Sequence, residues 1–221
     1  MWVNFVAVLI GGLVTIGTAV LIEYLRSPRL QFRLCSPTDH EYSQNHPAMK
    51  VRFVHLSVEN RTLPRCLKWM LRAAATECCG IVTFHHLDGQ KVFDRSMEIR
   101  WGSTPEPAPL EVAFGEQRAT VFDPNVWRMQ RVDIIPGESQ VLNVAARFDD
   151  DEECYGWNNE AYFSKPQWRN PKYRLPRDRY LVKVVVVSSG RKCSGTFRLN
   201  NDMPIGDFRI EKAQPSDVAR D

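Results

Sequence analysis

The sequence predicts a mainly β protein: an antiparallel, immunoglobulin-like β-sandwich with one short helix, preceded by an N-terminal transmembrane helix. Three observations lead to this prediction. Residues 5–22 contain no charged side chain. Beyond them, several short segments alternate apolar and polar residues, as half-buried strands do. Turn signals separate these segments and only one segment has helical spacing, so we expect the strands to form two antiparallel sheets that pack face to face.

The N-terminal apolar run has the length of a membrane span. As a helix rising 1.5 Å per residue, it extends roughly 27 Å, close to the hydrocarbon thickness of a bilayer. Trp2 and Tyr24 flank the run, where aromatic residues meet the membrane interface. A cleaved signal peptide is the alternative, although it would have a basic residue before a shorter apolar core. We therefore expect an anchor, a folded domain and a disordered tail, at residues 1–26, 27–212 and 213–221.

The charges around the run predict the orientation of the chain. Arg26, Arg29 and Arg33 follow the run, and no Lys or Arg precedes it. Because basic flanks stay in the cytoplasm, we expect a single-pass protein of the cell inner membrane with a cytoplasmic C-terminal domain. The 6 cysteines fit a reducing compartment, since a domain of this size has no need of disulfides. An exported, disulfide-bonded domain is the alternative, and the triplet Asn60-Arg61-Thr62 would then be a glycosylation signal.

Small residues share one face of the N-terminal helix. They recur every four residues, at Ala7, Gly11, Thr15 and Ala19. Small residues at this spacing let membrane helices approach closely, so the face predicts a homo-oligomer formed through the membrane helix. The alternatives are that small residues are simply common in such helices, or that the helices assemble into the pore of a membrane effector.

Alternation predicts the first strands. They cover residues 30–34, 50–60 and 79–87. In the second of them, Val54, Leu56 and Val58 share one face, which we expect to be buried. The third leads to Asp88-Gly89, a hairpin turn signal.

The segment that returns from this hairpin also alternates. Its apolar residues should point inward: Phe93, Met97, Ile99 and Trp101. Its polar residues should point outward: Asp94, Ser96, Glu98 and Arg100. The proline-rich stretch at 103–109 should end it as an extended loop.

One segment has helical spacing. Its apolar residues recur at intervals of three and four: Leu63, Cys66, Leu67, Met70, Leu71 and Ala74. Pro64 suits the first turn of a helix. The other side carries Arg65, Lys68, Trp69 and Arg72. This short helix could cap the β-domain or lie on an anionic membrane surface.

Four further segments complete the predicted sheets, at residues 131–135, 141–148, 180–190 and 193–201. The second should bury one face formed by Leu142, Val144, Ala146 and Phe148. The third is apolar on both faces except at Lys183, as expected for a central strand. The last should turn Cys193, Phe197 and Leu199 inward.

A run of acids, residues 149–153, follows the second of these strands (the acidic run). Such a run could hold Ca²⁺ through carboxylate oxygens. A contiguous run points its side chains in several directions, however, so we expect a solvated charged turn and no metal.

Aromatic residues, bases and prolines are interleaved from Cys154 to Asp178. A connection this long without secondary structure is uncommon and often functional. Aromatic residues with Arg also make interface hot spots, so the candidate partner-binding residues are Trp157, Tyr162, Trp168, Arg169 and Tyr173. The alternative is that the rings only pack the loop onto the sandwich.

Composition and motifs argue against other classes. With 29 bases matched by 26 acids and a net charge of +3, no nucleic-acid partner is expected. The chain contains no P-loop, G-x-S-x-G or H-E-x-x-H motif, and no cofactor is expected. A membrane-anchored metal-dependent hydrolase is the alternative, because acids from separate loops could converge, for example Asp149 or Asp151 beside Glu160.

The order of these segments resembles a group of uncharacterised prokaryotic single-pass membrane-anchored β-sandwich proteins. The resembling pieces are the anchor, DGQKVFDRSMEIRW, RFDDDEECYGWNNEAYF, and RYLVKVVVVSSG running into FRLNND. The resemblance covers most of the chain and implies no activity and no site residue. We expect a non-enzymatic binding or assembly module at the cytoplasmic membrane face, whose partners are the lipid bilayer and an unidentified protein.

Overall fold

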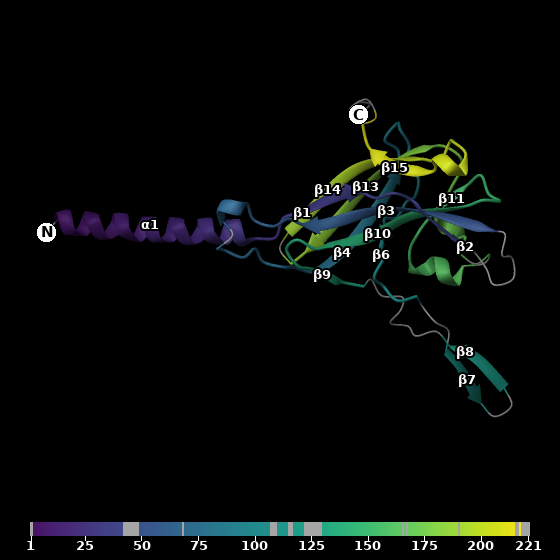
Figure 1. Cartoon of the computed structure of the whole chain (residues 1–221), viewed down its shortest axis with the longest axis horizontal. Coiled ribbons are helices and arrows are strands. Elements are labelled where there is room, and N and C mark those ends of the chain that lie inside the picture. Colours follow the sequence, from purple (N-terminus) through teal and green to yellow (C-terminus); the bar gives the residue numbers. More distant parts are fainter. Residues whose placement is uncertain are drawn as a thin grey trace.

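The computed structural model describes residues 2–41, 49–67, 69–106, 110–114, 117–121, 130–164, 166, 168–189, 191–214 and 217. Over these residues the chain is mainly β, with two antiparallel sheets and one N-terminal apolar helix. Figure 1 shows this helix, α1 (Trp2–Arg26), projecting from one end of the strands.

Helix α1 contains one stretch that could cross a membrane by its length and composition. The stretch is Leu9–Arg26, with a mean hydropathy of 1.5, and none of it is buried against the strands. A signal sequence passes the same test, so retention of the helix in a membrane stays a prediction.

The first sheet has seven strands. Its main order is β1-β3-β10-β11-β12, with β2 also paired to β3 and β6 also paired to β10. The bounds are β1 (Leu30–Leu34), β2 (Thr38–Glu41), β3 (Lys50–Asn60), β6 (Arg100–Trp101), β10 (Ser139–Phe148), β11 (Cys154–Gly156) and β12 (Arg174–Leu175).

The second sheet has six strands in the order β15-β14-β13-β4-β5, with β9 also paired to β4. The bounds are β4 (Ala75–His85), β5 (Met97–Glu98), β9 (Val132–Ile134), β13 (Arg179–Ser188), β14 (Arg191–Asn200) and β15 (Arg209–Lys212). Strand β13 is central, as its apolar faces predict. A separate hairpin pairs β7 (Leu110–Phe114) with β8 (Gln117–Val121).

One core joins the two sheets. Inward-facing side chains of both sheets form a single buried cluster, and each such side chain stabilises the fold by about 1.5–3 kcal/mol. Its members include Val54, Leu56 and Val58 of β3, Leu142 and Val144 of β10, Val82 and Phe84 of β4, Val182, Val184 and Val186 of β13, and Phe197 and Leu199 of β14. The predicted inward face of β3 is thus confirmed, and so are the inward positions of Phe197 and Leu199 in β14, whereas Cys193 is only half-buried.

A β-bulge corrects the predicted face of β10. The pairing of β10 with β3 shifts between Asn143 and Ala145, where one extra residue is inserted. Leu142 faces the core before the bulge and Val144, the extra residue, also lies in that core, whereas after the bulge Ala146 and Phe148 lie in a second buried cluster. The single alternating face of the prediction is wrong because a bulge reverses the alternation.

The predicted helix over residues 63–74 is wrong. Only a single 3₁₀ turn forms, η1 (Arg65–Leu67), and Lys68 lies outside the described residues. Met70 and Arg72 are buried while Leu71 between them is exposed, which is the alternation of an extended chain. A helix this short has little stability of its own, and Ala73 N instead donates to Arg26 O, at 2.6 Å, before β4 begins.

The described residues contain three further 3₁₀ turns: η3 (Asn159–Phe163), η4 (Pro171–Tyr173) and η5 (Ile205–Asp207). The expectation of a structureless connection after the acidic run is therefore wrong. That stretch contains η3 and η4 and the short strands β11 and β12, which extend the first sheet.

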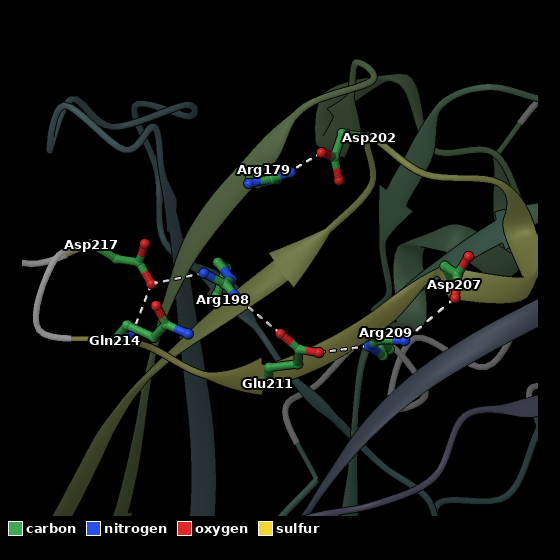
Figure 2. Close-up of polar contacts among 8 residues, drawn as sticks. All are labelled: Arg179, Arg198, Asp202, Asp207, Arg209, Glu211, Gln214 and Asp217. Carbon is green, nitrogen blue, oxygen red and sulfur yellow. Dashed lines mark hydrogen bonds and ion pairs between the residues drawn. The ribbon is translucent and has the colours of Figure 1, made fainter.

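An ion-pair network covers the outer edge of the second sheet. Figure 2 shows Arg198 between Glu211 and Asp217, and Arg209 between Glu211 and Asp207. The hydrogen bonds from Arg198 and Arg209 hold the pKa of Glu211 at about 2. The network joins β14 to β15 through charge pairing as well as backbone bonds.

Candidate functional site

An open groove of about 790 Å³ lies on the face of the first sheet that points away from the second sheet (the groove). Side chains alternate along a strand, so the neighbours of the inward-facing Val54 and Leu142 point to the opposite face. Those neighbours form the floor of the groove: Phe53, His55, Val141 and Asn143. Thr38 and His40 of edge strand β2 form one rim.

His55 ties β2 to the sheet. Its Nε2 lies 2.6 Å from Thr38 Oγ1 and its Nδ1 lies 2.8 Å from Asn143 Oδ1. An amide oxygen only accepts, so His55 Nδ1 donates to Asn143. In the neutral ring Nε2 then carries no proton and accepts a hydrogen bond from the Thr38 hydroxyl. Burial lowers the pKa of His55 and keeps the ring neutral.

Aromatic side chains form the wall at one end of the groove. Trp157 is edge-to-face with Phe53 and with Trp168, with ring centroids 4.7 Å and 5.5 Å apart. Tyr162 packs on both tryptophans. Trp157 is only 1% exposed and belongs to the second buried cluster, whereas Tyr162 and Trp168 are half-buried. Most of the wall is therefore packing, and its accessible part is Tyr162 and Trp168.

Trp168 holds a strained backbone conformation. Its φ of 67° lies in the left-handed region, which bulky residues rarely adopt and which costs on the order of 1–3 kcal/mol. A hydrogen bond from Trp168 N to Ala161 O, 2.9 Å long, holds the residue there. Strain of this kind clusters at functional sites, so it supports Trp168 as a site residue.

Arg100 lies where the groove meets a smaller cavity of about 240 Å³. The sequence pattern placed this side chain in solvent, but it is 5% exposed, so that prediction is wrong. Its guanidinium donates to Asn159 Oδ1 and Thr104 O, at 2.7 and 2.6 Å, and lies 4.8 Å from the centre of the Tyr162 ring. These contacts replace the water that a buried charge loses.

The smaller cavity is lined by polar groups with unused hydrogen-bonding capacity. Three buried atoms at its wall have no hydrogen-bond partner among the described residues: Trp101 Nε1, Thr104 Oγ1 and Asn158 Oδ1. Buried polar atoms are nearly always satisfied, so these atoms favour a bound polar group, either of a ligand or of water.

Two of the predicted partner-binding residues lie outside the groove. Arg169 pairs with Asp150 and Asp151 and its guanidinium lies 4.2 Å from the centre of the Phe148 ring. Tyr173 is buried in the main core at the wall of the smaller cavity. The structure thus brings together Trp157, Tyr162 and Trp168 and leaves these two apart from them.

Each carboxylate of the acidic run has a partner within the domain, and Asp150 and Asp151 share Arg169. Asp149 accepts from the Lys50 backbone N–H at 3.1 Å, and Asp151 accepts from the Tyr155 hydroxyl at 2.8 Å. The other acids pair with arginines, as Asp150–Arg169, Glu152–Arg177 and Glu153–Arg174. Glu160, proposed as a partner acid, instead accepts from Lys172 at 3.1 Å. Within the described ranges, no three His, Cys, Asp or Glu side chains are grouped to hold a metal ion.

The small residues of α1 lie on an exposed helix. A Cβ added at Gly11 would meet no atom within 4 Å, and Thr15 Oγ1 donates to Gly11 O at 2.9 Å. Ala19 is exposed, and the side chain of Ala7 lies outside the described residues. Self-association through this face stays a prediction.

Sequence reasoning missed His55, Arg100 and Thr38 as site residues. The available signal was the outer face of β3, where Phe53, His55 and Ser57 alternate with the buried apolar residues. Arg100 gave no such signal, because its burial depends on Asn159 and Tyr162, which are far away in the sequence.

All six cysteines lie among the described residues and are free thiols. Searches for related proteins add no identity: no protein-family model, no curated protein and no solved structure matches the chain.

Proposed function

We propose that the chain is a membrane-tethered, non-enzymatic binding module: an immunoglobulin-like β-sandwich held at the cytoplasmic face of the inner membrane, which presents the groove to a partner protein. The observation that carries this proposal is that three predicted binding residues, Trp157, Tyr162 and Trp168, line one open groove. Aromatic side chains with an adjacent Arg are typical of interface hot spots.

The groove suits a polypeptide segment as its occupant. It combines aromatic surface with charges of both signs, from Arg100, Glu41 and Glu106. Strand β2 pairs with β3 alone among the described strands, and an edge strand can pair with an added strand of a partner. The smaller cavity beyond Arg100 would then receive a polar side chain of that segment.

Three observations support the cytoplasmic orientation. Arg26 and Arg29 flank the end of α1, as the positive-inside rule requires. The six free thiols fit a reducing compartment. Asn60, which would carry a glycan in an exported protein, is fully buried and its Nδ2 donates to Ala73 O and Ile134 O, each at 3.0 Å. In the folded domain this side chain is therefore not accessible as an acceptor for a glycan.

Self-association through Ala7, Gly11, Thr15 and Ala19 would place several grooves side by side. Crosslinking of Gly11→Leu and the parent chain in native membranes tests it, because a bulky residue blocks close helix approach. Loss of dimers in the variant supports assembly through this face. If the parent chain makes vesicles leak and Gly11→Leu loses both the leakage and the dimers, a pore is favoured instead.

A photo-crosslinker in native membranes tests the groove. One variant carries it at Val141, which is 37% exposed in the groove, and the control carries it at Val187, 38% exposed on β13 of the second sheet. We expect a defined protein adduct from position 141 that is absent from position 187. Equal adducts, or recovery of the intact chain in the aqueous fraction without detergent, would overturn the proposal.

A further inference from the structure

Six bases surround the end of α1 where the β-strands begin (the collar). They are Arg26, Arg29, Arg61, Arg72, Arg191 and Lys192. Four of them, Arg29, Arg61, Arg191 and Lys192, line one open groove of about 390 Å³. The six bases come from four separate stretches of the chain, so only folding brings them together.

Short contacts hold the collar to the helix end. Arg72 donates to Ser27 O at 2.9 Å and Arg191 donates to Ser27 Oγ at 2.7 Å. Arg29 and Arg191 also lie over the Tyr24 ring, 5.3 and 5.9 Å from its centre. Tyr24 is the aromatic residue predicted to lie at the membrane interface, so the guanidinium groups lie at the same depth.

Over the part of the chain that the structure describes, the collar bases lack acidic partners. Among the described residues, none of the six forms an ion pair with a carboxylate, and the nearby Glu59 is taken by Arg33 at 2.5 Å. Burial and the neighbouring Arg29 and Arg61 lower the pKa of the Arg72 guanidinium, which shows that like charges are crowded here. Crowded cations without counter-charges are complementary to an anion.

Apolar side chains project beside the collar. Trp69 and Leu71 are 77% and 79% exposed, while Met70 between them is buried and holds the segment in place. The Ala73–Arg26 backbone bond fixes the segment against the helix end. Exposed Trp and Leu next to a basic groove are typical of a surface that enters the membrane interface.

We propose that the collar binds the phosphate headgroups of anionic phospholipids, with Trp69 and Leu71 in the interface around them. Guanidinium groups hold phosphate oxygens in pairs, and bases next to a membrane helix are attracted to anionic lipid. This inference rests on the membrane tether of the proposed function and names the lipid class that the tether selects. The bound lipid would fix the orientation of the β-domain relative to the bilayer.

Lipid titration of the full-length chain in detergent tests the proposal. Native mass spectrometry would measure retained phosphatidylglycerol, with phosphatidylcholine as the neutral headgroup. We expect preferential retention of phosphatidylglycerol, weakened roughly 10- to 30-fold in the double variant Arg61→Gln/Arg191→Gln. Both arginines are exposed, so the fold should persist, and Arg61→Lys/Arg191→Lys should retain most of the binding.

The control variant removes the same charge elsewhere. Arg174→Gln/Arg177→Gln alters two exposed arginines that pair with Glu153 and Glu152, and its lipid binding should stay within about twofold of the parent. Equal loss in both double variants would show a non-specific charge effect and overturn the proposal. Displacement of the lipid by an equal concentration of inorganic phosphate would also overturn it, because the site would then be one for free anions.

The failures of the two proposals are distinguishable. A chain that stays in the membrane fraction but binds both lipids equally contradicts the collar and leaves the tether intact. A chain recovered in the aqueous fraction contradicts the tether, and the collar inference falls with it. Brominated phosphatidylcholine in nanodiscs should quench the parent more than Trp69→Phe, and equal quenching would remove Trp69 from the interface.

Discussion

Two regions of this chain combine arginines with large aromatic side chains: the collar, and the stretch from Cys154 to Tyr173 that follows the acidic run (the aromatic loop). In the aromatic loop, Arg169 pairs with acids and Trp157 is 1% exposed. In the collar, no described base pairs with an acid and Trp69 is 77% exposed. Similar residue types thus form a packed structure in one region and an open, charged surface in the other.

The difference lies in the partners that the fold supplies. The acidic run stands next to the aromatic loop in the sequence, and its carboxylates neutralise Arg169, Arg174 and Arg177. Among the described residues no carboxylate pairs with the collar bases, which come from four stretches of chain. An aromatic and basic composition therefore indicates a binding surface only after its internal pairing is known.

The largest expected effect contrasts the two tryptophans. Trp157→Ala should lower the free energy of unfolding by about 3–5 kcal/mol, because it leaves a cavity in the second buried cluster. Trp69→Ala should change it by less than about 0.5 kcal/mol, because that side chain is exposed. Thermal or denaturant unfolding of the full chain in detergent measures both. Similar losses of stability in the two variants would contradict the difference in packing between Trp157 and Trp69.

The next effect tests the buried support of the collar. Asn60 accepts from Arg29 N at 3.1 Å and donates to two carbonyls, so Asn60→Leu should cost about 1–3 kcal/mol, chiefly because the buried Ile134 carbonyl is left unpaired. Thr62→Ala removes the same glycosylation triplet and should change stability little, because Thr62 is exposed. Unfolding midpoints compare them, and an unchanged midpoint for the Asn60 variant would contradict its role.

A pH series tests the groove beside the aromatic loop. The pKa of His55 is lowered by burial, while in the unfolded chain it returns to about 6.5. The unfolded chain therefore binds the proton more readily than the folded chain. The contribution of neutral, buried His55 to stability is complete above about pH 6.5 and is lost as the pH falls below that value. Unfolding midpoints from pH 8 to 5 should decline more gently in His55→Asn than in the parent. His86→Asn, at a half-buried position, is the control, and equal slopes for the two variants would contradict the prediction.

The smallest effect concerns the paired charges in Figure 2. The pKa of Glu211 is about 2 in the folded chain and about 4.3 in the unfolded chain. Its stabilisation is present above the unfolded value and is lost as the pH falls from about 4.5 through about 2. In this pH window the unfolding midpoint of Glu211→Gln should decrease less steeply with falling pH than that of the parent chain. Glu152→Gln removes an exposed carboxylate of the acidic run as the control, and an identical slope in both variants would show that the network contributes nothing.

Much of the fold could be predicted because strand patterns are local. The alternation around Val54, Leu56 and Val58 identified a strand and its buried face, and the apolar run of β13 identified a central strand. The failures occurred where one distant contact overrides a local pattern: the bulge after Asn143 reverses β10, and Ala73 N donates to Arg26 O where the predicted helix would have needed an internal hydrogen bond.

The candidate site was predictable in part. Trp157, Tyr162 and Trp168 were identified by composition, and the structure places all three around the groove. Arg169 and Tyr173 have the same composition signal but are paired or buried elsewhere. His55 and Arg100 were missed because a lone His or Arg in a strand carries no local sign of burial.

By itself, the sequence determined an apolar N-terminal helix, the strands and the near balance of charge, because each depends on residues adjacent in the chain. Only the tertiary structure decided which aromatic residues are packed, which arginines are neutralised and where the groove opens. Those outcomes depend on distances between residues far apart in the chain, and such distances exist only after the sheets have packed.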